Sequence, residues 1–119
     1  MSLKISTLQK DGDASNEYIL LEATEEVNIS NYAIVDRTYN KDGKVSNVHR
    51  HFFRFPSQIV KKGECVSLWT GKGTPIEGKT EQGTKVYRYY WGSDAPFWND
   101  KEVEKAELLK VSTVGTATA

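Results

Sequence analysis

Hydrophobic and polar side chains alternate along much of this chain with a period of two, which is typical of strands that bury one face. The clearest example ends at Pro56, where His51, Phe53 and Phe55 fall on one face of the segment that starts at Val48. Other segments of strand length are separated by turn-forming residues. They are Leu3–Leu8, Tyr18–Ala23, Tyr32–Val35, Cys65–Thr70 and Thr84–Trp91.

This spacing predicts an all-β fold of about seven to nine strands, arranged as a sandwich or barrel. Only one segment, Asp100–Leu109, also fits a helical pattern, and its alternating charges suit an exposed strand equally well. The length of 119 residues favours one domain over 1–119. We expect residues 1–3 to be a cloning remnant and 112–119 to be a frayed tail.

Seven large side chains are expected to fill the core between two sheets, each contributing about 1.5–3 kcal/mol by burial. They are Tyr32, Ile34, Phe53, Phe55, Val66, Leu68 and Trp91.

The charge balance excludes a strongly basic protein, because Lys plus Arg and Asp plus Glu each number 16. A dedicated nucleic-acid-binding domain normally carries a clear basic excess. The single cysteine, Cys65, cannot form a disulfide within the chain and is expected to act as a small hydrophobic side chain. No apolar run approaches the roughly 18 residues that a membrane span needs.

One segment, Gly73–Thr80, matches the phosphate-binding pattern G-x-x-x-x-G-K-[ST]. That pattern binds phosphate where the loop opens a helix, whose free N–H groups meet the anion. Here β-branched and aromatic residues follow, and Pro75 removes one N–H. We therefore interpret the segment as a long Gly- and Lys-rich hairpin loop and not as a nucleotide site.

Two further motifs are incomplete as metal sites. His49 and His51 would share one face of a strand, but a zinc site needs more ligands than this pair supplies. The acidic stretch before Gly43 fails the calcium-loop spacing, since position 12 of that loop would be His49 and not Glu. The sequence thus predicts no catalytic residue, no metal and no cofactor.

Seven segments, taken in order, resemble the landmarks of the lamin tail domain, an immunoglobulin-like module. The opening strand resembles E-[FY]-[VI]-x-[LI], and later segments are similar to aromatic-x-F-P, to L-x-x-G-[EQ]-x-V-x-[IVL]-W and to the W-G, W-x-N and A-x-L landmarks. The segments are Asn16–Ala23, Val27–Asp36, His51–Pro56, Ile59–Trp69, Tyr90–Gly92, Phe97–Asn99 and Ala106–Leu108.

This resemblance implies an immunoglobulin-like β-sandwich that acts without catalysis, as a protein-interaction or tethering module of a larger protein. It favours a bacterial extracellular or cell-surface protein, with the nuclear lamina as the alternative. We expect a monomeric domain whose protein partner the sequence does not identify.

The candidate binding surface consists of four cations, Arg50, Arg54, Lys61 and Lys62. Arg54 lies between Phe53 and Phe55, so strand alternation points it outward. Two alternatives stay open: weak nucleic-acid binding through these cations, and a small hydrolase that uses the Gly73–Thr80 segment or the histidine pair.

Overall fold

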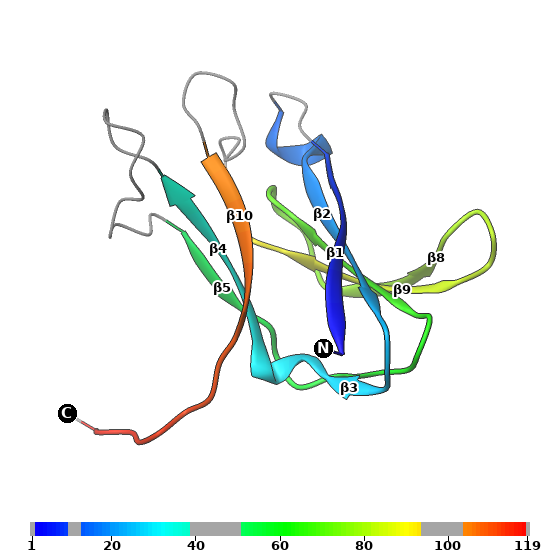
Figure 1. Cartoon of the computed structure of the whole chain (residues 1–119). Helices are drawn as coiled ribbons and strands as arrows, with labels where there is room; N and C mark the ends of the chain where they lie inside the picture. The colour runs from blue at the N-terminus through cyan, green and yellow to red at the C-terminus, as the bar shows by residue number, and fades with distance from the viewer. Residues whose placement is uncertain (1, 10–12, 39–50, 94–103, 119) are drawn as a thin grey trace.

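The computed structural model describes residues 2–9, 13–38, 51–93 and 104–118 (Figure 1). Within these ranges the chain forms ten strands and two short 3₁₀ helices, which confirms the all-β prediction. The elements are β1 (Leu3–Gln9), η1 (Ala14–Asn16), β2 (Tyr18–Ala23), β3 (Val27–Asn28), η2 (Ile29–Asn31), β4 (Tyr32–Thr38), β5 (Phe52–Arg54), β6 (Ile59–Val60), β7 (Cys65–Trp69), β8 (Ile76–Lys79), β9 (Lys85–Tyr90) and β10 (Glu104–Lys110).

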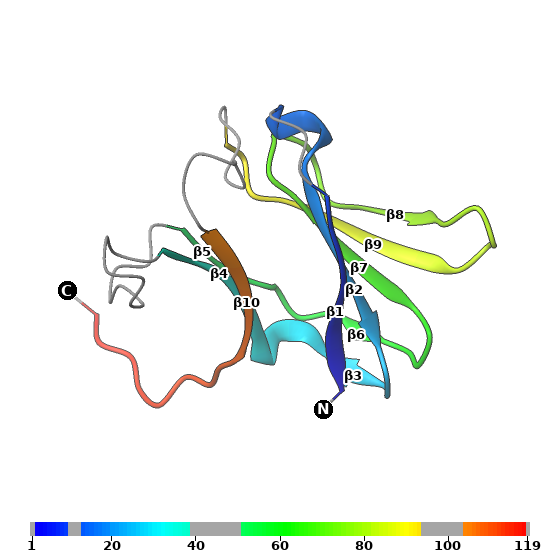
Figure 2. The same cartoon turned by 45° about the horizontal axis from the view of Figure 1, so that its top comes forward.

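The strands form a five-stranded sheet of order β1-β2-β7-β9-β8 and a three-stranded sheet of order β10-β4-β5. Strands β3 and β6 pair with each other at the end of the five-stranded sheet where β1 begins (Figure 2). All strand pairs are antiparallel except β7 and β9, which run parallel. The two larger sheets lie on opposite sides of the molecule, and the arrangement is that of a β-sandwich (Figures 1 and 2).

The core lies between the two sheets because alternate side chains of each strand point inward. Leu21 and Leu68 from the larger sheet and Ile34 from the smaller one are fully or almost fully buried. Of the seven predicted core residues, five are buried, while Phe53 and Trp91 are half-buried and pack against the cluster. The ring centroids of Phe53 and Trp91 lie 5.8 Å apart.

Glu17 is a fully buried acid at the junction between η1 and β2. Its carboxylate accepts a 2.8 Å hydrogen bond from the hydroxyl of Thr70, and its carbonyl accepts one of 2.9 Å from the Thr70 N–H. Burial of a carboxylate is costly unless hydrogen-bond donors compensate it, and the Thr70 hydroxyl is such a donor. The two hydrogen bonds also join the start of β2 to the residue after β7.

The structure adds detail on two points that the sequence left approximate or open. The strand number exceeds the predicted seven to nine, partly because β3 and β6 have two residues each and show no alternation in sequence. In the doubtful segment Asp100–Leu109, the described part from Glu104 onward is strand β10 and not helix. Pairing with β4 decides this, because it brings Ala106 and Leu108 against the core.

Candidate functional site

The predicted cationic surface starts with Arg54, which is exposed on β5 as expected. Its guanidinium is held on both sides: Nε donates to the Ser30 carbonyl at 2.8 Å and Nη1 donates to the Thr113 hydroxyl at 2.9 Å. Thr113 belongs to the segment after β10 that was expected to fray, which forms no helix or strand. Arg54 therefore connects η2 to that segment through two of its five N–H groups.

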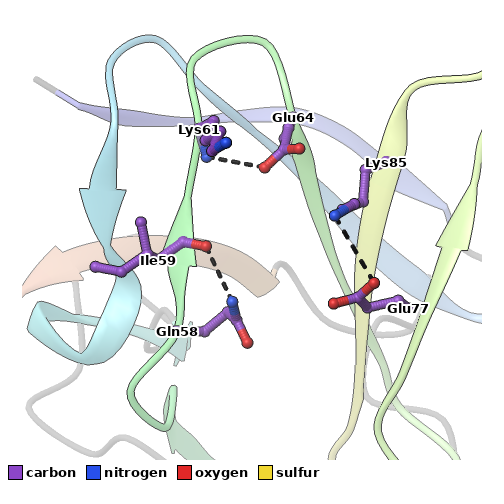
Figure 3. A network of polar contacts seen from close by, with 6 residues as sticks. All are labelled: Gln58, Ile59, Lys61, Glu64, Glu77 and Lys85. Carbon is purple, nitrogen blue, oxygen red and sulfur yellow. Dashed lines mark hydrogen bonds and ion pairs between the residues drawn. The ribbon is translucent and has the colours of Figure 1, made fainter.

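The two lysines of the predicted surface lie in the turn between β6 and β7. Glu64 caps this turn, since its Oε1 accepts from the Lys61 N–H at 2.9 Å and its own N–H donates to the Lys61 carbonyl at 3.0 Å (Figure 3). Lys61 and Lys62 are both exposed. Figures 1 and 2 place this turn beside the five-stranded sheet and away from β5, so the described cations are not one patch. Arg50 lies outside the described residues.

The segment Gly73–Thr80 does not open a helix. Ile76–Lys79 forms strand β8, which pairs with β9 from Ile76↔Arg88 to Lys79↔Lys85. The expectation of a long loop is therefore wrong, while the rejection of a helix-based phosphate cradle agrees with this geometry.

His51 is half-buried, and its ring meets Trp91 edge to face with the centroids 6.2 Å apart. His49 and the loop Asn40–Gly43 lie outside the described residues. In the described ranges no three His, Cys, Asp or Glu side chains gather as metal ligands would. The described residues also include no helix that is long and apolar enough to cross a membrane.

A feature that the sequence analysis missed lies on the outward face of the five-stranded sheet. The rings of Tyr18 on β2 and Trp69 on β7 lie 4.6 Å apart and are tilted by 34°. The guanidinium carbon of Arg88 on β9 lies 5.5 Å from the centroid of the Trp69 ring. Three neighbouring strands thus contribute one continuous stack of two aromatic rings and a cation.

The stack borders a hollow of about 170 Å³. Two residues that point outward beneath it, Ser67 and Val86, are only 3% and 6% exposed. The Ser67 hydroxyl accepts a 3.1 Å hydrogen bond from the indole Nε1 of Trp69, which fixes that ring. Eight residues line the hollow: Tyr18, Leu20, Ser67, Trp69, Lys79, Thr80, Val86 and Arg88.

Strand register explains why this stack forms. Tyr18 stands directly opposite Trp69, and Ser67 stands opposite Arg88, so Arg88 is a diagonal neighbour of the indole. Such cross-strand neighbours lie within reach of long side chains. One sequence signal was available, because Tyr18 and Leu20 are apolar at outward positions of a strand whose inward positions are apolar too. A strand that is apolar on both faces indicates cover on both.

The lining of the hollow combines basic and apolar side chains. Two of its lining residues are basic and none is acidic, while the aromatic and aliphatic side chains offer apolar surface. The nearby thiol of Cys65 is a poor nucleophile, because burial, assisted by the charge of Glu22, raises its pKa. The arrangement can hold a carboxylate next to an apolar group, and it offers no activated nucleophile.

The sequence was compared with family models and with curated proteins. No family model matches the chain, and no curated protein matches it.

Proposed function

We propose that this domain is a non-enzymatic protein-interaction module with an immunoglobulin-like sandwich of the lamin tail type. The ordered sequence landmarks support this proposal, because the described ones fall on consecutive strands or at their ends. The segment 16–23 covers β2, the segment 59–69 covers β6 and β7, and the segment 106–108 lies in β10. Most of these landmarks supply core residues, so they support the fold more strongly than any particular partner.

The outward hollow is the binding surface that we propose for this module, and the stack of Tyr18, Trp69 and Arg88 is the observation that carries the proposal. Tyr, Trp and Arg dominate the binding energy of protein interfaces, because they bury large areas at low cost in conformational entropy. Arg88 lines the hollow, and none of the residues that line it is acidic. Charge complementarity therefore selects an extended polypeptide segment that carries an acidic residue beside a large apolar one.

The test is selection from a display library of random peptides against the whole domain. We expect enrichment of peptides with Asp or Glu next to an aromatic or aliphatic residue. The Trp69→Ala variant should lose this binding because it removes the central ring, and Arg88→Ala should weaken it because it removes the cation. Lys62→Ala, on the distant turn, is the matched control and should bind as the parent does.

Enrichment of basic peptides, or binding that survives Trp69→Ala, would overturn the proposal. Nucleic acid is the competing class of partner, and a single-stranded oligonucleotide tests it in the same assay. Phosphate binding weakens steeply between low and moderate salt, since it depends on the release of counterions. If the oligonucleotide binds in this salt-dependent way and the peptides do not, the module binds nucleic acid instead.

A further inference from the structure

Strand β8 is an exposed edge of the five-stranded sheet. In the part of the chain that the structure describes, its only ladder partner is β9. Figures 1 and 2 show the β8–β9 hairpin at the outer side of the sheet, away from the three-stranded sheet. Ile76, the first residue of β8, is 60% exposed. An unpaired edge with an exposed apolar side chain is a template for another strand.

The hairpin turn determines which backbone groups of β8 point outward. The Gly83 N–H donates to the Thr80 carbonyl at 2.9 Å, and the Thr80 N–H donates to the Thr84 carbonyl at 2.8 Å. Thr80 therefore directs its backbone groups toward β9. Because this direction alternates along an antiparallel strand, Glu77 and Lys79 direct their N–H and C=O groups to the free edge.

The charges on this hairpin are unevenly matched. Lys79 stands directly opposite Lys85 in the ladder, and like charges in such positions are destabilising. Glu77 lies diagonally across and pairs with Lys85, with 3.8 Å between its Oε2 and the lysine Nζ (Figure 3). The structure gives Lys79 no ion pair with a described residue, so the free edge carries an uncompensated cation next to an accessible carboxylate.

We propose that β8 pairs with β8 of a second copy, antiparallel and centred on Gly78, so that Glu77 of each copy faces Lys79 of the other. In this register the outward backbone groups of both residues meet and form two hydrogen-bonded pairs. Ile76 then faces Thr80 of the second copy. The contact is isologous, as a two-fold dimer requires.

Neighbouring registers fit less well. Centring on Glu77 places the two Glu77 carboxylates opposite each other and sets Lys79 against Pro75, which has no N–H to donate. Centring on Lys79 places two lysines opposite each other. Only the Gly78 register matches the charges and the outward backbone groups together.

The dimer is expected to be weak, because a four-residue strand pair lies well below the size of a standard interface. Sedimentation equilibrium from about 10 µM to about 1 mM covers the range that such a contact requires. The parent should self-associate more strongly at low salt, since the Glu77–Lys79 pairs are exposed and screened.

Charge reversal is the decisive test. Glu77→Lys alone places lysines against lysines, and Lys79→Glu alone places acids against acids, so each should raise the dimer Kd about tenfold or more. The double variant Glu77→Lys/Lys79→Glu should restore dimerisation. An equimolar mixture of the two single variants should form a heterodimer, because each supplies the charges that the other lacks. The circular dichroism spectrum of each variant should stay that of the parent.

A parent that remains monomeric to about 1 mM would overturn the proposal and would identify these edge charges as protection against aggregation. Dimerisation that both single reversals leave unchanged would place the contact elsewhere. The dimer contact shares Lys79 and Thr80 with the lining of the hollow but does not use its aromatic stack, so Trp69→Ala should dimerise like the parent. A dimer paired about Gly78 differs from the monomer expected from the sequence. It places the outward faces of the two five-stranded sheets on the same side of the dimer.

Discussion

At the scale of single residues, the fully buried carboxylate of Glu17 needs a hydrogen-bond donor to offset the cost of its burial. Its carboxylate depends on the Thr70 hydroxyl at 2.8 Å. Thr70→Val keeps the shape of the side chain but removes this donor. We expect a loss of about 1.5–3 kcal/mol in the free energy of unfolding, the usual worth of a hydrogen bond to a charged group, measured by urea denaturation.

Thr7→Val on the exposed face of β1 is the matched control, and its stability should change by no more than about 0.5 kcal/mol. If Thr70→Val and Thr7→Val prove equally mild, the carboxylate of Glu17 does not rely on Thr70.

The thiol of Cys65 gives a prediction about pH. Burial, with the charge of Glu22 as a second cause, raises its pKa above the ordinary value of 9.0. The folded state therefore holds this proton more tightly than the unfolded state does. The resulting stability is fully present below pH 9 and is lost as the pH rises through the raised pKa.

The rate of iodoacetamide alkylation measures this pKa, because the thiolate is the reacting form. Its midpoint should lie above that of a cysteine in an unstructured peptide, and Glu22→Gln should lower it toward that value. A midpoint below the peptide's would contradict the burial of this thiol.

At the scale of elements, the β8–β9 hairpin depends on Gly83, which adopts φ +84° at the turn. Gly83→Ala forces a Cβ into the left-handed region and should cost about 1–2 kcal/mol in thermal unfolding. Gly78→Ala is the control within β8, since the nearest atom to its new Cβ lies at an ordinary 3.7 Å and its φ is not positive. Equal effects of the two substitutions would show that the turn does not constrain the hairpin.

Sequence periodicity predicted the longer strands well, because their inward side chains alternate clearly. The range Tyr18–Ala23 matches β2, and Thr84–Trp91 contains β9. Strand β8 was missed because Ile76–Lys79 is short, contains glycine and has mostly exposed side chains. The identity of β10 depends on its pairing with β4, which local sequence does not encode.

At the scale of the whole molecule, the sequence could predict the core but not the hollow. The burial of single residues such as Phe55 and Leu68 can be predicted from the alternation of apolar and polar positions along a strand. The stack of Trp69 and Arg88, in contrast, depends on the parallel register between β7 and β9. These two residues are 19 positions apart in the chain. Of the described cations, Arg54 lies on β5 in the three-stranded sheet, whereas Lys61 and Lys62 follow β6, which belongs to a different sheet.

The alternative of a hydrolase also belongs to this scale. A ligand that binds only the folded state raises the melting temperature. We expect neither zinc nor a nucleoside triphosphate to raise the Tm of the domain in differential scanning calorimetry, because β8 is a strand and His51 packs against Trp91. A concentration-dependent rise with either ligand would reopen that alternative.

The most direct test of the binding account is an NMR titration of the isotope-labelled domain with an acidic, apolar peptide from the selection. We predict that the chemical shifts change on β2, β7 and β9, with the largest changes at Tyr18, Trp69 and Arg88. Shift changes confined to Arg54 or to the Lys61–Lys62 turn would contradict the account.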